Sequence, residues 1–142
     1  MSDEIYDICK RYIEIRKHLR TCITRSMEPA SEKGTPPMRP LFFDFPSDEH
    51  TWKIEDAYMF GSELLVAPIL FENRRFRDVC LPTETNWENA WTGESFTGGQ
   101  TISVDAPIEK IPLVIKKRFL AGYCVGIIPA NETGGGNDPG QN

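Results

Sequence analysis

Basic side chains are not in excess in this chain of 142 residues: 16 Lys and Arg face 21 Asp and Glu, a formal net charge of −5. Nucleic-acid binding needs a basic patch that neutralises phosphates, so nucleic acid is not the expected partner. The sequence also has no uninterrupted apolar run near the roughly 20 residues that span a bilayer, so we expect no membrane association. Residues 1–6 lack the basic-then-apolar order of a signal peptide, and the compartment stays unknown.

Cysteine and histidine are too few and too scattered to predict a metal site. The four cysteines are Cys9, Cys22, Cys80 and Cys124. They include no C-x-x-C pair, whereas structural zinc sites need closely spaced ligands. His18 and His50 are isolated and expected at the surface. We therefore expect no metal and no cofactor, and interpret the cysteines as small buried or half-exposed thiols.

The chain is too short for a complete (β/α)8 barrel, which takes about 250 residues, but long enough for one ordinary domain. Hydrophobic residues make up 39% of it and aromatic residues 11%. This composition is compatible with a packed core and argues against wholesale disorder.

The first part of the sequence predicts helices around one strand. Apolar residues recur every three or four positions from Asp3 to about Glu28, which predicts an amphipathic helix. After the break at 33–37, the apolar run Leu41–Phe45 is typical of a strand covered on both faces, as in a parallel sheet. A short helix is expected next, through Met59, ending before Gly61.

From Glu63 onward the pattern predicts short strands separated by turn residues. The five expected strands are 64–70, 76–81, 87–91, 100–104 and 111–115. Such spacing is typical of an antiparallel sandwich or barrel. Ile102 and Val104 alternate with Thr101, Ser103 and Asp105, so that strand should have one buried and one wet face.

Several of these segments, in this order and spacing, resemble glycoside hydrolase family 31, the α-glucosidase and α-xylosidase family, over roughly residues 10–116. The segments that carry the resemblance are His18-Leu19-Arg20, Gly34 to Phe42, Gly61 to Pro68, Val79 to Pro82, Trp87 to Gly93, Gly98-Gly99 and Ile111-Pro112. The Trp-x-x-x-Trp-Thr-Gly form with Gly-Gly-Gln resembles the α-xylosidase-like members more than the animal digestive enzymes.

This resemblance implies an α/β part followed by an all-β part. Residues 1–60 would be the last helix–strand–helix portion of a TIM barrel. Residues 61–118 would be most of the proximal C-terminal β-sandwich, left incomplete. Residues 119–142 diverge from the family and are expected to form a flexible, glycine-rich tail.

The resemblance also implies a chemistry whose residues are missing from this chain. Glycoside hydrolysis with retention needs two carboxyl groups about 5 to 5.5 Å apart. In the family these are aspartates, the nucleophile lying in a Trp-x-Asp-Met-Asn-Glu-type motif. Neither that motif nor the later proton-donor segment is present. No catalytic residue is therefore assigned, and the substrate-binding residues stay unknown.

We thus expect a fragment of a retaining α-glycosidase that acts on terminal α-linked sugars, itself inactive. An α-linked oligosaccharide or xyloside would be the ligand of the parent enzyme. The alternative is a non-catalytic module, either a carbohydrate-binding sandwich or a structural part. Association with a catalytic barrel or self-association is possible, because a lone barrel strand leaves its edges and faces uncovered.

A few residues invite a functional interpretation and a plainer structural one. Asp44, at the end of the predicted barrel strand, could line a pocket, but a carboxylate bonded to loop amides or Arg39 is the better interpretation. Trp87 and Trp91, with Trp52, could stack on sugars, although core packing is favoured for the first two. The remaining carboxylates look like solvated helix-terminus charges; they include Asp48, Glu49, Glu55 and Asp56. Gly98-Gly99 is interpreted as a hairpin turn.

Overall fold

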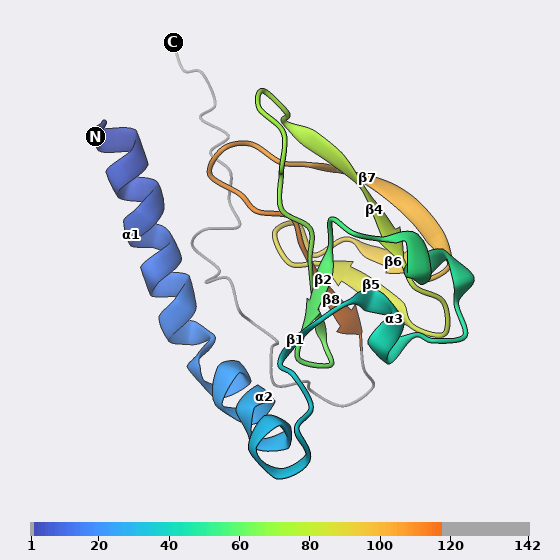
Figure 1. Ribbon diagram of the computed structural model, residues 1–142. Helices are drawn as coiled ribbons and strands as arrows, with labels where there is room; N and C mark the ends of the chain where they lie inside the picture. The colour runs from blue at the N-terminus through green and yellow to red at the C-terminus, as the bar shows by residue number, and fades with distance from the viewer. Residues whose placement is uncertain (1, 118–142) are drawn as a thin grey trace.

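The computed structural model describes residues 2–117, and the predicted tail at 119–142 lies outside that range. The described chain forms three layers: two helices, a six-stranded sheet and a two-stranded ribbon (Figure 1). Every strand pairing in the described part is antiparallel. The expectation of an antiparallel β domain is thereby confirmed. None of the described helices is long and apolar enough to cross a bilayer.

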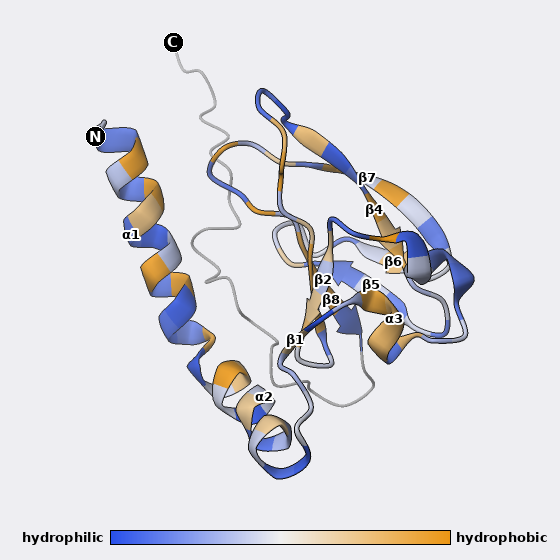
Figure 2. Cartoon of the chain, in the orientation of Figure 1, coloured by the Kyte–Doolittle hydropathy of each residue, from blue (hydrophilic) through white to orange (hydrophobic). Residues whose placement is uncertain are grey.

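The helical layer consists of α1 (Asp3–His18) and α2 (Arg20–Lys33). The sequence predicted one helix ending near Glu28, so its extent was wrong in two ways. The helix is interrupted at Leu19, and it continues past Pro29 to the left-handed cap at Gly34, where φ is 71°. Ser2 caps the start of α1, accepting a hydrogen bond from the Ile5 amide. Figure 2 shows apolar stretches on α1 alternating with hydrophilic ones, as an amphipathic helix requires.

The segment after the helices departs most from the sequence prediction. Leu41–Asp44 is a short helix, α3, and the strand lies just before it as β1 (Met38–Arg39). Leu41 and Phe45 are buried while Phe43 is 47% exposed. A strand covered on both faces would bury all three, whereas burial at a spacing of four fits a helical turn.

A second misassigned helix follows. The expected helix through Met59 is replaced by the 3₁₀ turn η1 (Glu49–Lys53) and the strand β2 (Tyr58–Phe60). Gly61 does adopt the left-handed conformation, with φ of 64°, but it sits in the turn that leads from β2 to β3 (Leu64–Val66). Only three residues connect the paired strands β2 and β3, so this connection is too short to contain the end of a helix.

The six-stranded sheet has the order β1-β2-β3-β8-β5-β6, with β5 (Asn86–Asn89), β6 (Ser95–Thr97) and β8 (Leu113–Lys117). The ribbon pairs β4 (Phe76–Leu81) with β7 (Gln100–Asp105). All five predicted strands exist, with shifted ends except at β4, while β1, β2 and β6 were not predicted. Gly98-Gly99 is not a hairpin turn, because it connects β6 in the sheet to β7 in the ribbon.

Two apolar cores lie on the two faces of the sheet. Between sheet and ribbon the core includes Met59, Leu65, Val79, Trp87 and Val104. Between sheet and helices it includes Ile15, Cys22, Leu64, Trp91 and Leu113. The sheet is thus covered on both sides, and on β7 the predicted alternation is confirmed, with Ile102 and Val104 inside.

Candidate functional site

Asp44, which the sequence placed at the edge of a potential sugar pocket, is held in an ion pair. The Arg39 guanidinium donates to both of its oxygens, Nε to Oδ2 at 2.7 Å and Nη2 to Oδ1 at 2.9 Å. Arg39 is only 8% exposed and its guanidinium also lies 5.1 Å from the centre of the Phe43 ring. With both oxygens bonded to Arg39, Asp44 joins α3 to β1. The structural interpretation of Asp44 is confirmed.

Asp48 is the carboxylate that sequence analysis misjudged. It was expected to be solvated, yet it is 8% exposed. Its Oδ1 accepts from the His50 amide at 3.1 Å, and Oδ2 accepts from the Thr83 amide at 3.0 Å. Asp48 therefore clamps the η1 turn to the loop after β4, a partner 35 residues away that no local pattern indicates. The other three carboxylates in that group, Glu49, Glu55 and Asp56, are exposed as expected.

The three tryptophans separate into two buried residues and one exposed residue. Trp87 is fully buried and Trp91 is 4% exposed, so core packing is confirmed for both and neither offers an open face to a sugar. They belong to different cores, because Trp91 lies beyond the end of β5. Trp52 is 57% exposed and stacks on Phe42, with ring centres 4.7 Å apart and planes 5° apart.

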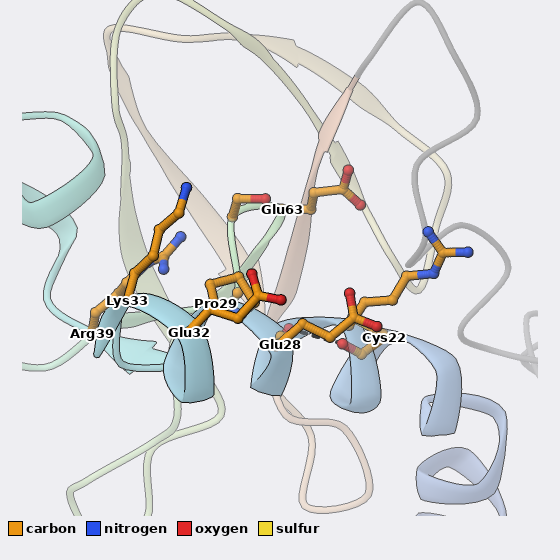
Figure 3. Close-up of a pocket in the computed structure, with 11 residues that line it drawn as sticks. Cys22, Glu28, Pro29, Glu32, Lys33, Arg39 and Glu63 are labelled. Atoms are coloured by element: carbon orange, nitrogen blue, oxygen red, sulfur yellow. Dashed lines mark hydrogen bonds between the residues drawn. The ribbon is translucent and has the colours of Figure 1, made fainter.

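A cavity of about 330 Å³ lies between α2 and the β2–β3 turn (Figure 3). Its charged lining is balanced, with three basic and three acidic residues: Arg25, Lys33, Arg39, Glu28, Glu32 and Glu63. Lys33 and Arg39 lie together at one end, Glu28 and Cys22 at the other, and Glu63 faces them from the turn. Such mixed charge fits no single ligand class, and we assign no chemistry to this cavity.

Two ionisable groups have perturbed proton affinities that trace to burial. Burial raises the pKa of the Tyr12 phenol, which the hydrogen bond with the Ile111 amide partly offsets. Burial, with the charge of Asp48 adding to it, raises the pKa of the Cys80 thiol. A thiol kept protonated is a poor nucleophile, so Cys80 is not a catalytic candidate.

Metal and disulfide chemistry can be stated for the described residues only. Within 2–117, no group of three or more His, Cys, Asp or Glu side chains could hold a metal ion. Cys9 and Cys80 are free thiols. Cys22 is disulfide-bonded, so the expectation of thiols throughout was wrong for that residue.

A comparison with known protein families shows which family contains this arrangement of helices and strands. Residues 34–118, more than half of the chain, match the C-terminal domain of glycosyl hydrolase family 31. The chain belongs to glycosyl hydrolase family 31. The predicted resemblance is thereby confirmed.

Among characterised family 31 relatives, alpha-glucosidase 2 of Bacillus thermoamyloliquefaciens is 37% identical over 110 residues, which cover 78% of this chain and 14% of that protein. The sulfoquinovosidase of Escherichia coli K12 is 45% identical over 83 residues, 58% of this chain and 12% of that protein. The chain thus spans about a seventh of the length of the relatives it matches.

Among solved structures, a family 31 alpha-xylosidase from a soil metagenome, complexed with xylose, superposes with a TM-score of 0.80. It is 45% identical, over 82% of this chain and 17% of that one. A Flavobacterium johnsoniae family 31 dextranase complexed with isomaltotriose gives a TM-score of 0.78 at 32% identity. The described part of the chain therefore has the fold of the corresponding part of these glycosidases.

Proposed function

We propose that this chain is the C-terminal segment of a retaining α-glycosidase that acts on terminal α-linked sugars. The observation that carries the proposal is the family 31 C-terminal match over residues 34–118, together with relatives that act on α-glucosides and α-xylosides. In the parent enzyme, the helices before residue 34 would complete the end of the catalytic barrel, and residues 34–118 would form the domain that braces it.

The helices of the N-terminal part leave an apolar face uncovered. β1 pairs with β2 on one side, and its other edge has no partner among the described strands. Beside it α1 carries a second apolar stripe away from the sheet, with Tyr6 58% and Ile13 59% exposed. An uncovered helix face is what a barrel segment leaves exposed when its neighbouring helices are missing, whereas β1 and β2 belong to the antiparallel sheet that also contains β3.

The chain by itself is proposed to be inactive on these substrates. Its sequence has no Trp-x-Asp-Met-Asn-Glu-type motif, and Asp44, the carboxylate considered for a pocket edge, is bonded to Arg39 through both oxygens. A single bonded carboxylate cannot supply both the nucleophile and the acid of a retaining mechanism.

The test is an assay of the purified chain with 4-nitrophenyl α-D-glucopyranoside and α-D-xylopyranoside. We expect hydrolysis no faster than in buffer, and no change in Asp44→Asn. Enzyme-like turnover that is lost in Asp44→Asn would overturn the inactivity. Sequencing the transcript upstream of Met1 tests the parent: a continuous frame encoding the nucleophile motif supports it, and a stop codon in frame before any such motif contradicts it.

A further inference from the structure

The sulfur that bonds to Cys22 comes from outside residues 2–117. Cys22 is disulfide-bonded, while Cys9 and Cys80, the other cysteines of that range, are free thiols. Cys80 lies on β4 in the ribbon, and the six-stranded sheet separates the ribbon from the helices. The chain has four cysteines, and the fourth is Cys124. Within one chain, the second sulfur can therefore come only from Cys124.

Cys22 has a fixed position where α2 packs on the sheet. It is 4% exposed and belongs to the apolar core between the helices and the sheet. It also contributes to the wall of the cavity between α2 and the β2–β3 turn, residues 61–63 (Figure 3). Helix and turn are in close contact, because a Cβ atom at Gly61 would lie 2.6 Å from Ser26 Oγ. The Cys22 sulfur is thus held beside this turn.

β8 leads out of the described residues beside the same turn. Ile115 of β8 is paired with Leu64 of β3, and the Lys116 amide donates to the Glu63 carbonyl at 2.7 Å. Cys124 follows Lys117 by seven residues. Seven extended residues span about 23 Å, which is ample for a chain that starts at the turn to reach the neighbouring helix.

We propose that Cys22 and Cys124 form one intramolecular disulfide, which ties residues 118–124 to α2 at the Cys22 end of the cavity. The bond closes a loop of roughly 100 residues that contains the whole sheet and the ribbon. Such a loop restricts the unfolded chain more than a short one does, so the tether stabilises the fold. The proposal does not rest on the glycosidase function, because it uses only the cysteines and their positions.

The tether is sensitive to the redox state of its surroundings. Its formation removes two protons and two electrons from two thiols, and a disulfide of the oxidised-glutathione type accepts them and leaves as two thiols. Disulfides persist in oxidising compartments and are opened where glutathione and thioredoxin keep thiols reduced. Cys80 is a poor competitor in this exchange, since burial raises the pKa of its thiol. Reduction therefore releases residues 118–124 from α2.

Peptide mapping of the full 142-residue chain tests the pairing. The chain is oxidised in a glutathione buffer, free thiols are blocked with N-ethylmaleimide in denaturant, and trypsin cleaves after Arg20, Arg25 and Arg118. We expect residues 21–25 to be disulfide-linked to residues 119–142 in the monomer, with N-ethylmaleimide on the other two cysteines. N-ethylmaleimide on Cys22, or a disulfide between 21–25 and any other peptide, would overturn the proposal.

Thermal unfolding with and without dithiothreitol tests the role of the bond. Dithiothreitol should lower the midpoint of the unmodified chain by about 10 °C, because it opens the large loop. It should also speed hydrogen–deuterium exchange in α2. Cys124→Ser should have the lowered midpoint without reductant, and dithiothreitol should then have no further effect.

Cys9→Ser is the matched control, because it removes a free thiol of the same helical layer. It should keep both the linked peptides and the full response to dithiothreitol. A midpoint that reduction leaves unchanged, or a Cys124→Ser variant that responds to dithiothreitol as the unmodified chain does, would contradict the tether. None of these measurements involves glycoside hydrolysis, so their failure is distinct from failure of the proposed function.

Discussion

At the scale of single residues, the Arg39–Asp44 pair joins a nearly buried guanidinium to both oxygens of a carboxylate. The two hydrogen bonds are parallel and charge-assisted, and Arg39 is nearly excluded from water. A buried pair of this kind adds less to stability than its geometry suggests, since both ions lose hydration. Removing one partner is costly, however, because the other charge stays buried.

Asp44→Ala should therefore lower the free energy of unfolding by about 3 kcal/mol. Chemical denaturation followed by circular dichroism measures the change. Glu55→Ala, at an exposed carboxylate with no ion pair in the described residues, is the control and should be near neutral. Equal stability of the two variants would show that Arg39 finds solvent or another partner.

The Tyr12 side chain connects α1 to the loop before β8 through two hydrogen bonds. Its hydroxyl donates to the Glu109 carbonyl at 3.1 Å and accepts from the Ile111 amide at 2.7 Å, and its ring meets Trp91 edge-on. Tyr12→Phe should cost about 1 kcal/mol of stability. Tyr6→Phe, at an exposed tyrosine without a hydrogen bond in the described part, should cost nothing measurable.

The burial of Tyr12 also predicts that the stability of the fold depends on pH. Burial raises the pKa of Tyr12 above its ordinary value of 10.0. The folded chain then holds the phenolic proton more tightly than the unfolded chain, so this stabilisation is complete below pH 10 and is lost as the pH rises from 10 through the folded pKa. Denaturation midpoints between pH 9 and 11 should fall less steeply in Tyr12→Phe than in Tyr6→Phe. Identical slopes would refute the raised pKa.

At the scale of elements, the passage from β6 to β7 depends on close approach at Gly98. A Cβ atom there would overlap the backbone carbonyl oxygens of Pro82 and Thr85, which cannot move without shifting the loop between β4 and β5. Gly98 also donates its amide hydrogen to the Thr85 carbonyl at 3.0 Å. The crossing between sheet and ribbon is therefore a packed junction and not a free turn.

Gly98→Ala should destabilise the fold by about 2 kcal/mol or more, through overpacking. Gly93→Ala is the comparison: φ is 75° there but a Cβ would meet nothing within 4 Å, so only the backbone strain of about 1 kcal/mol applies. Thermal unfolding of both variants measures the difference. A smaller loss for Gly98→Ala than for Gly93→Ala would mean that the loop between β4 and β5 yields easily.

At the scale of the whole molecule, the described chain leaves large apolar side chains uncovered on α1. Tyr6 and Ile13 lie on the stripe turned away from the sheet, and the outer edge of β1 pairs with no strand among residues 2–117. We predict that the chain alone self-associates through this surface, since covering it removes apolar area from water.

Light scattering after size-exclusion chromatography, over a range of concentrations, measures that association. Tyr6→Ser combined with Ile13→Ser should raise the dissociation constant about tenfold or more. Phe76→Ser, at a similarly exposed residue on β4 in the ribbon, should change it little. A monodisperse monomer at every concentration would contradict the prediction.

The features that the sequence predicted correctly are those that depend on interactions between residues close together in the chain. The span of β4 and the alternation on β7 follow from turn residues and a period of two, and both are seen as predicted. The burial of Trp87 and Trp91 follows from their size and apolar character. In the candidate sites, the Arg39–Asp44 pair could be anticipated because its partners are five residues apart. The burial of Asp48 could not, because one of its partners, Thr83, is 35 residues away.

By itself the sequence determined the family, the change from helices to short strands, and the lack of the nucleophile motif, since each is written in residue order and spacing. Only the tertiary structure decided that Leu41–Asp44 is helical, that Asp48 reaches Thr83, and that Gly98 joins two sheets. The physical reason is the same in all three. Short apolar or polar segments fit more than one backbone conformation, and contacts with distant parts of the chain select among them.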